Sequence, residues 1–366
     1  MPGGKWDYLV VGAGPAGAAL AWRLGRAGFR VLVAEALPRP GMKPCGRGIP
    51  DAGDLPFRVP GECVVRRIRG ARLYVDNREA FNIEGSLEGY IVDRSCLAEA
   101  LISEGGAELV TRAFYNKRRS FIRIGGHLLD ARRDRTIIAG GHPYYPGEKI
   151  EAVQVLLPGD WPDRLDIFFD IELIGYYWVF PSTPGLVEIG VGGFAPMARL
   201  RELLNGFLRR HPAAEPFHGK EPVKLEGARI AVGGVWRRGL EEWPLHIGEA
   251  AGFVYPLTGE GIRPSMLSAV RLGDALASRN SPSSILRGEP ARGITLQRRI
   301  LEAVKSMSPP ERASLLTSIP GSLHVKVALG RAGWRDLARA LVRRPRLLAK
   351  IARFIRAGGG DHGGGV

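Results

Sequence analysis

The sequence is poor in cysteine, with only Cys45, Cys63 and Cys96 in 366 residues. Because these three are odd in number, far apart and without a C-x-x-C pair, their pattern argues against a disulfide framework and against a zinc site. The seven histidines contain no i, i+4 pair, so we expect no metal site. This cysteine usage predicts a reducing, intracellular compartment.

Long apolar runs are also missing. No stretch approaches the roughly 18 apolar residues of a membrane-spanning helix, and the first strand pattern begins at Tyr8, which leaves little room for a signal peptide. We therefore expect a cytoplasmic protein, with association at the periphery of a membrane left open.

Acidic residues are scarce relative to basic ones: 37 Asp and Glu stand against 52 Lys and Arg, a net charge of +15. Such an excess favours a polyanionic partner, and we expect an anionic membrane surface rather than nucleic acid. Residues 331–356 hold nine basic side chains and one acid, Asp336. Leu348, Ile351, Phe354 and Ile355 recur there at helical spacing, which is typical of a membrane-docking helix or of a helix packed on its own domain.

A βαβ pattern opens the chain. The apolar run at 8–11 is followed by Gly12-Ala13-Gly14-Pro15-Ala16-Gly17, a helix to about Arg26, and a second strand ending at Glu35. In this context the first glycine permits a tight turn, the second admits a pyrophosphate and the third allows close packing of helix and strand. Glu35 is placed to accept hydrogen bonds from a ribose. The pattern predicts a dinucleotide site.

The sequence favours FAD over NAD at this site because a second glycine-rich segment, Gly248 to Gly252, follows another apolar strand more than 200 residues later. A distant segment of this kind closes over the ribityl chain in two-domain flavoproteins, and a simple nicotinamide dehydrogenase does not need it.

At this point the chain resembles the geranylgeranyl reductase family, within the flavoproteins shaped like p-hydroxybenzoate hydroxylase. The resemblance spans about residues 12–275 and is carried by KPCGRG at 43–48, Asp93-Arg94, YYWVFP at 176–181 and GEAAGFVYPLTGEGI at 248–262. It implies a cofactor site formed by Gly12, Gly14, Ala16, Gly17, Glu35, Ala36, Cys45, Gly46, Arg94, Gly248, Glu249, Gly259, Gly261 and Ile262.

Three positions depart from the family pattern. Glu249 stands where the family has Asp, Gly140 replaces another acid, and Leu173 replaces a proline. Glu249 and Gly140 keep open a paralogue that binds lipid without efficient flavin use.

The resemblance also implies a reaction, the saturation of isolated prenyl double bonds. Tyr176, Trp178 and Phe180 share one face of a strand, where they suit an apolar polyene and a developing positive charge. Cys45 lies in a loop that the family places above the flavin, where its thiol could donate a proton. A packing role for these residues is the alternative interpretation.

We therefore expect an α/β protein in which a Rossmann-like FAD-binding domain is interleaved with an antiparallel-sheet substrate domain and followed by a helical C-terminus. The expected division is 1–63, 92–160 and 245–280 for the FAD domain, 64–91 and 161–244 for the substrate domain, 281–357 for the helices, and 358–366 for a disordered tail.

The expected function is FAD-dependent reduction of geranylgeranyl chains on membrane glycerophospholipids or their precursors. Its partners would be the prenylated lipid and an electron donor that the sequence leaves open, NAD(P)H or a ferredoxin-like protein. An aromatic hydroxylase of the same flavoprotein shape is the rival enzyme.

Overall fold

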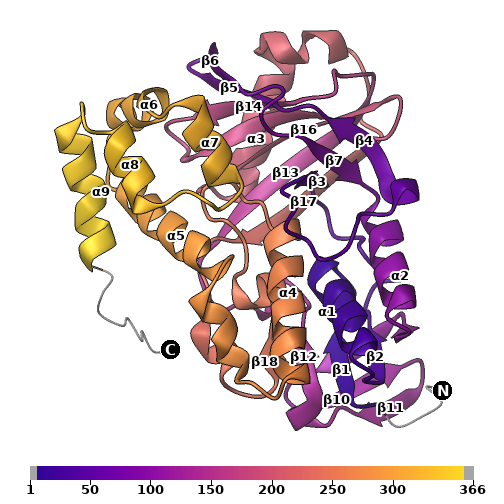
Figure 1. The fold of residues 1–366 in the computed structure, drawn as a ribbon. Helices are drawn as coiled ribbons and strands as arrows, with labels where there is room; N and C mark the ends of the chain where they lie inside the picture. Colours follow the sequence, from indigo (N-terminus) through magenta and orange to yellow (C-terminus); the bar gives the residue numbers. More distant parts are fainter. Residues whose placement is uncertain (1–5, 358–366) are drawn as a thin grey trace.

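The computed structural model describes residues 6–357, and the tail expected at 358–366 lies outside this range. A parallel five-stranded sheet occupies one end of the molecule (Figure 1), in the order β18-β12-β1-β2-β8. Its strands are β1 (Tyr8–Val11), β2 (Val31–Ala34), β8 (Glu108–Val110), β12 (Thr136–Ile138) and β18 (Leu245–His246).

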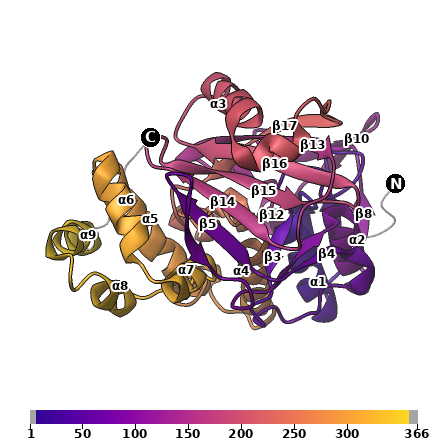
Figure 2. The ribbon, with the colours of Figure 1, turned by 90° about the horizontal axis from the view of Figure 1, so that it is seen from above.

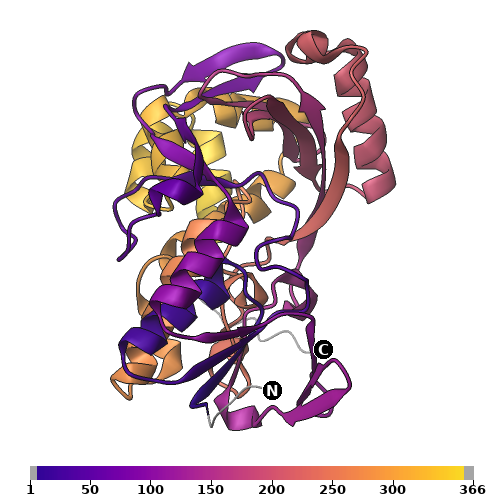
Figure 3. The same cartoon turned by 90° about the vertical axis from the view of Figure 1, so that its right-hand side faces the viewer.

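Both faces of this sheet are covered, as the near-continuous apolar strands require. On one face Val10 and Val33 pack into a core shared with the helices α1 (Pro15–Arg26), α2 (Arg94–Glu104) and α4 (Ile262–Ala277). On the other face Leu9 and Leu32 pack against a small antiparallel sheet, β9 (Ala113–Asn116), β10 (Phe121–Ile124) and β11 (His127–Asp130). The β10–β11 hairpin lies at the end of the molecule remote from the second large sheet (Figure 3).

The second large sheet has seven strands in the order β17-β13-β16-β15-β14-β5-β6, all antiparallel to their neighbours except the pair β14 and β5. The strands are β5 (Ala71–Val75), β6 (Arg78–Asn82), β13 (Lys149–Pro158), β14 (Leu165–Asp170), β15 (Gly175–Pro181), β16 (Leu186–Gly193) and β17 (Lys224–Ala231). β13 begins at Lys149, ahead of the domain boundary that we predicted at residue 160.

The two faces of the seven-stranded sheet have different partners. Val179, Val187 and Ile189 pack against α3 (Met197–Arg210), while the alternate residues face the other way. A separate three-stranded sheet has the order β3 (Gly48–Pro50), β7 (Gly89–Val92) and β4 (Val64–Ile68). The predicted α/β class with separate antiparallel sheets is confirmed.

The C-terminal region is helical, as expected, and lies away from α3 (Figure 2). It comprises α5 (Ala291–Lys305), α6 (Pro309–Ser318), α7 (Gly321–Ala328), α8 (Trp334–Ala340) and α9 (Pro345–Ala357). Short 3₁₀ helices lie at Gly61–Cys63, Arg133–Arg135, His142–Tyr144, Pro212–Phe217, Arg237–Leu240, Gly248–Ala251 and Pro282–Arg287.

The apolar face of α9 is used inside the protein. Ile351 is fully buried, and Leu348, Phe354 and Ile355 pack on the same helical core, with α5 as the main neighbour. Of the two interpretations of this segment, the structure supports packing on the chain's own helices. No helix within residues 6–357 is long and apolar enough to cross a membrane.

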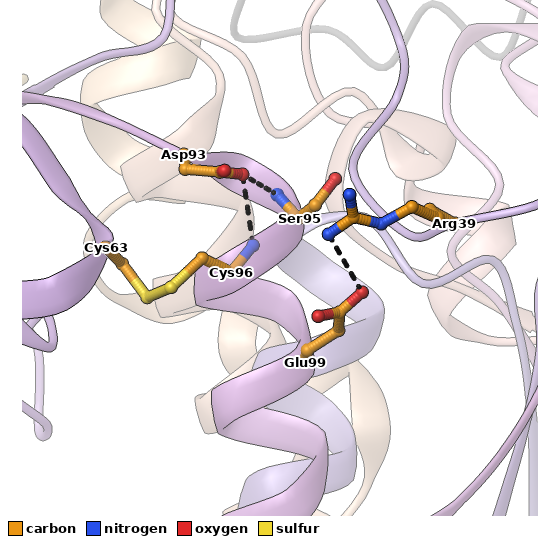
Figure 4. The surroundings of a disulfide bond; sticks show 6 residues. All are labelled: Arg39, Cys63, Asp93, Ser95, Cys96 and Glu99. Atoms are coloured by element: carbon orange, nitrogen blue, oxygen red, sulfur yellow. Dashed lines mark hydrogen bonds and ion pairs between the residues drawn. A yellow bond between two sulfur atoms is a disulfide. The ribbon is translucent and has the colours of Figure 1, made fainter.

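Cys63 and Cys96 form a disulfide, which corrects our expectation (Figure 4). Cys63 precedes β4, and Cys96 lies in the first turn of α2, which follows β7. Because β4 and β7 pair antiparallel, they bring the two Cα atoms to 5.4 Å although 33 positions separate them. The spacing of cysteines in the sequence does not reveal a contact that is made by strand pairing. Because two of the three cysteines form a disulfide, cysteine usage no longer supports a reducing compartment.

Candidate functional site

A cavity of about 820 Å³ lies between the parallel sheet, the seven-stranded sheet and the C-terminal helices. At one end it is bordered by the residues that follow β1, β2 and β12, because the carboxyl ends of parallel strands meet at one edge of a sheet. Among residues 6–357, no three His, Cys, Asp or Glu side chains gather in a way that could hold a metal ion.

The first glycine-rich turn borders this end of the cavity. Gly12 has a φ of 100°, and a Cβ there would lie 2.8 Å from the carbonyl oxygen of Ala139, so only glycine fits. A Cβ at Gly14 would have no protein atom within 4 Å. The turn is therefore packed against Ala139 at Gly12, but has free space next to Gly14. Gly14 is the N-cap of α1, and the N-terminus of a helix stabilises an anion.

Glu35 follows β2 at the edge of the cavity and is buried. Its Oε2 accepts a hydrogen bond from the Ala13 N–H at 2.7 Å, and its Oε1 accepts one from the Leu37 N–H at 2.8 Å. These two bonds fix the carboxylate between the glycine-rich turn and the end of β2, the place that the motif assigns to a ribose contact.

Arg94 reaches the cavity from the first turn of α2. Its Nη1 donates to the carbonyl oxygen of Lys43 at 2.7 Å, which ties the helix to the loop that carries Cys45. The guanidinium is nearly buried, and its Nε has no hydrogen-bond partner among the described residues. A buried donor without a partner costs free energy, so Arg94 has donor capacity left for a ligand in the cavity.

The second glycine-rich segment supplies Glu249 to the same end of the cavity. Its Oε2 lies 2.6 Å from the Nζ of Lys43, and its Oε1 accepts a hydrogen bond from the Ala231 N–H at 3.3 Å. Further along, Gly259 adopts a φ of 68° and Gly261 precedes α4 as its N-cap. This segment therefore places a second helix N-terminus at the cavity.

The aromatic row lies on the cavity face of β15. Tyr176, Trp178 and Phe180 all line the cavity, with successive ring centroids 6.0 and 6.2 Å apart. Tyr176 donates its hydroxyl hydrogen to the carbonyl oxygen of Thr258, and burial raises the pKa of Tyr176 to about 12. The hydroxyl stays protonated at neutral pH and holds the sheet to the segment that leads into α4.

Cys45 is a half-buried free thiol that lines the cavity between the aromatic row and the glycine-rich turn. The Arg47 N–H donates a hydrogen bond to its Sγ at 3.4 Å. A Cβ at Gly46 would lie 3.3 Å from the Phe180 ring, so the turn that carries the thiol sits directly on the aromatic row.

The far part of the cavity is largely apolar and was not predicted. The C-terminal helices line it with Ile300, Leu301, Val304, Leu315, Leu316, Ile319, Val327, Ala328 and Leu337, together with the polar side chains of Arg312 and His324. The spacing of Ile300, Leu301 and Val304 marks one face of a helix, but a sequence pattern does not say what that face lines.

Most of the predicted site residues line this cavity. Gly12, Gly14, Ala16, Glu35, Ala36, Cys45, Gly46, Arg94, Glu249, Gly259, Gly261 and Ile262 line it together with the aromatic row. Gly17 and Gly248 lie behind the lining: a Cβ at Gly17 would collide with the Gly12 carbonyl, and one at Gly248 with the Ala16 side chain. The individual roles of these residues stay predictions.

Comparisons with known proteins agree with this geometry. Residues 10–51 match the family model of an NAD(P)-binding Rossmann-like domain. The chain is 28% identical over 309 residues to digeranylgeranylglycerophospholipid reductase 2 of Methanopyrus kandleri, covering 75% of this chain and 77% of that protein. It is 29% identical to geranylgeranyl diphosphate reductase of Rhodobacter capsulatus over 289 residues, covering 70% and 71%. The resemblance to geranylgeranyl reductases is confirmed.

Solved structures show the same fold. A geranylgeranyl bacteriochlorophyll reductase-like protein of Thermoplasma acidophilum superposes with a TM-score of 0.74 at 21% identity, covering 95% of this chain and 99% of that one. A halogenase solved in complex with FAD gives a TM-score of 0.60 at 12% identity, covering 96% and 86%. The chain therefore has the fold of flavoproteins as well as sequence similarity to prenyl reductases.

Proposed function

We propose that this protein is an FAD-dependent oxidoreductase that reduces isolated double bonds in geranylgeranyl chains, on membrane glycerophospholipids or their precursors. The observation that carries the proposal is the continuity of the cavity. One space runs from the glycine-rich turn, past Cys45 and the aromatic row, to an apolar compartment under α5–α8. A prenyl chain that lies in the apolar part can therefore extend to the nucleotide end within one cavity.

The nucleotide end fits FAD on three counts. The space in front of Gly14 is free for a pyrophosphate, the carboxylate of Glu35 is held at the edge for a ribose, and Arg94 has a buried donor without a partner. When bound and reduced, FAD supplies the hydride that an alkene carbon accepts. The electron donor for the cofactor, NAD(P)H or a ferredoxin-like protein, stays a prediction.

The residues beside the nucleotide end would assist by binding and by proton supply. Burial of a prenyl chain contributes roughly 25 cal/mol per Å² of apolar surface, and the faces of Tyr176 and Trp178 favour positive charge on the carbon that is being reduced. Cys45 would supply or relay the proton that the other alkene carbon needs. Tyr176 is less suited to that task, because burial raises the pKa of Tyr176 and its hydrogen is already donated to Thr258.

We expect the C-terminal segment to contact an anionic membrane surface through its basic side chains alone. Since the apolar face of α9 is buried, we place this contact on Arg343, Arg346 and Arg353, without insertion of the helix. Changing these three residues to Gln should lower co-sedimentation with anionic vesicles at low salt, where each basic residue near the lipid contributes about 1 kcal/mol. Equal binding of parent and variant would remove this segment as the contact.

Mass spectrometry of the lipid tests the proposed reaction. Flavin-loaded protein, chemically reduced and incubated with digeranylgeranylglycerophospholipid, should yield lipid that has gained two hydrogen atoms per reduced bond. A Gly14→Val variant, expected to lack the cofactor, is the control. Unchanged lipid with flavin that is reoxidised only by oxygen would favour the rival hydroxylase, and lipid that binds unchanged to a protein without a flavin spectrum would favour a binding paralogue.

A further inference from the structure

Glu188 is a buried carboxylate beside the aromatic row that no motif drew attention to. It lies in β16, where it alternates with Gly190 and Gly192 and therefore points to the cavity side of the sheet. The residue is 1% exposed. Its Oε1 accepts a hydrogen bond from the indole Nε1–H of Trp178 at 3.1 Å.

The same carboxylate faces the turn that carries Cys45. Its Oε1 lies 3.4 Å from where a Cβ of Gly46 would be, and its Oε2 lies 3.9 Å from the Nη2 of Arg47. Arg47 has a positive φ of 57° and also donates to the Ser182 hydroxyl. Glu188 thus contacts both the aromatic ring on the sheet and the cation next to the thiol.

Glycine permits this arrangement on the sheet. A Cβ at Gly190, the cross-strand neighbour of Trp178, would collide with the indole ring. The ring can therefore lie flat over β16 and reach Glu188 with its N–H. The indole has one hydrogen-bond donor, and the carboxylate is the partner that satisfies it.

We infer that Glu188 is a positioning residue, whose carboxyl group fixes the Trp178 indole and, when ionised, holds through Arg47 the turn that carries Cys45 over the cavity. The inference deepens the proposed function, on which it rests for its kinetic consequence. The contact with Trp178 and Arg47 can be tested without any turnover.

The charge of Glu188 depends on pH near neutrality. Burial raises the pKa of Glu188 to about 7, and Arg47 works against that rise. Glu226 on β17 is the other charged group that acts on it, and it also raises the pKa. Above about pH 7 the ionised carboxylate attracts Arg47; below it the neutral acid keeps the indole contact and loses that attraction.

The test compares Glu188→Gln with a matched substitution elsewhere in the sheet. Asp166 on β14 is also 1% exposed and accepts hydrogen bonds from Trp161 Nε1 at 3.1 Å and from Arg164 Nε at 3.0 Å. It repeats the tryptophan, carboxylate and arginine arrangement, but its partners Trp161 and Arg164 do not line the cavity, whereas Trp178 and Arg47 do. Asp166→Asn therefore removes a similar buried charge away from the site.

The first readout is the NMR signal of the Trp178 indole N–H, assigned by its loss in Trp178→Phe and followed over pH in flavin-free protein. We expect a shift with a midpoint near pH 7 in the parent and in Asp166→Asn, and a pH-independent signal in Glu188→Gln. A parent signal that does not move between pH 5.5 and 8.5, a window of roughly 1.5 units on each side of that midpoint, would overturn the inference.

The second readout is turnover of the prenyl lipid. In the parent, kcat should rise through the same midpoint. In Glu188→Gln the part of this rise that depends on Glu188 should be absent, and kcat should be about tenfold lower at pH 8, since small displacements of reacting groups slow chemistry strongly. KM and flavin content should stay unchanged. A Glu188→Gln enzyme with the parent's pH profile would show a merely structural role. If the parent itself reduces no prenyl lipid, the proposed function fails. The pH dependence of the Trp178 indole N–H signal still tests the contact between Glu188 and Trp178.

Discussion

The Nζ of Lys43 lies 2.6 Å from the Oε2 of Glu249 and joins the loop before Cys45 to the second glycine-rich segment. Glu249 stands where the family pattern led us to expect the shorter Asp, and its carboxylate pairs with this lysine. Both side chains are largely shielded from solvent, so the pair is screened less than a surface pair.

Shortening this acid tests whether the site needs the longer side chain. Glu249→Asp should hold FAD at least as tightly as the parent, because it keeps the charge and withdraws from Lys43 toward the backbone. Equilibrium dialysis of FAD measures the effect, with Glu249→Gln as the control that removes the charge. Weaker binding in Glu249→Asp would show that this chain has adapted to the longer acid.

Gly14 is the position where a side chain should remove the cofactor and leave the fold intact. Since nothing lies within 4 Å of a Cβ at Gly14, Gly14→Val should fold normally and fill the space of the pyrophosphate. We expect loss of bound flavin in the absorption spectrum with little change in melting temperature. Gly126→Val, at an equally open glycine after β10, is the control and should keep its flavin.

Cys45 is the expected proton source. Cys45→Ala should slow alkene reduction by about 10²-fold or more, the usual contribution of a positioned acid, without loss of FAD. Stopped-flow reoxidation of reduced enzyme by the prenyl lipid gives the rate. If the rate equals that of the parent while stability falls, the thiol packs and does not move protons.

The disulfide should contribute to stability. It closes a loop between positions 33 apart in the sequence, for which chain-entropy arguments give about 3–4 kcal/mol. Cys96→Ala should therefore lower the urea midpoint, and dithiothreitol should lower that of the parent to a similar value without affecting the variant. A midpoint in the parent that is insensitive to reductant would count against the bond.

Two buried carboxyls make stability fall with rising pH. Burial raises the pKa of Glu188 and of Glu260 to about 7, so the folded protein binds these protons more tightly than the unfolded chain between pH 4.5 and 7. Each contribution is fully present below the unfolded value and is lost as pH passes 7, by roughly 3 kcal/mol.

Glu188→Gln isolates one of these contributions from all other titrating groups. In urea unfolding of flavin-free protein, the variant should lose less free energy of unfolding between pH 5 and 8 than the parent. Parallel pH curves for the two proteins would mean that Glu188 is not buried as described.

The parts of the molecule that could be predicted from the sequence are those with local signals. The turn at Gly12–Gly17 and the alternation of Tyr176 to Phe180 each depend on residues close in the chain, and both appear as expected. The parts that could not be predicted are contacts between distant segments. Cys63 with Cys96, Lys43 with Glu249 and Trp178 with Glu188 are made by strand pairing and domain packing, which single-sequence periodicity does not encode.

The lining of the far end of the cavity could not be predicted for the same reason, because it depends on how distant segments pack. Val304 and Leu315 were expected only to lie on helices, and their position over the seven-stranded sheet follows from how α5 and α6 pack. For the basic segment at the C-terminus, the helix itself could be predicted but the partner of its apolar face could not. Its periodicity predicts an amphipathic helix correctly, but Ile351 is buried in the protein and not available to lipid.

The most direct test of the proposed function is anaerobic reoxidation of the reduced, flavin-loaded protein, followed by absorbance. Adding digeranylgeranylglycerophospholipid should restore the oxidised flavin spectrum in the absence of oxygen, and a fully saturated analogue should not. Reoxidation by oxygen alone, with no response to the unsaturated lipid, would contradict the account.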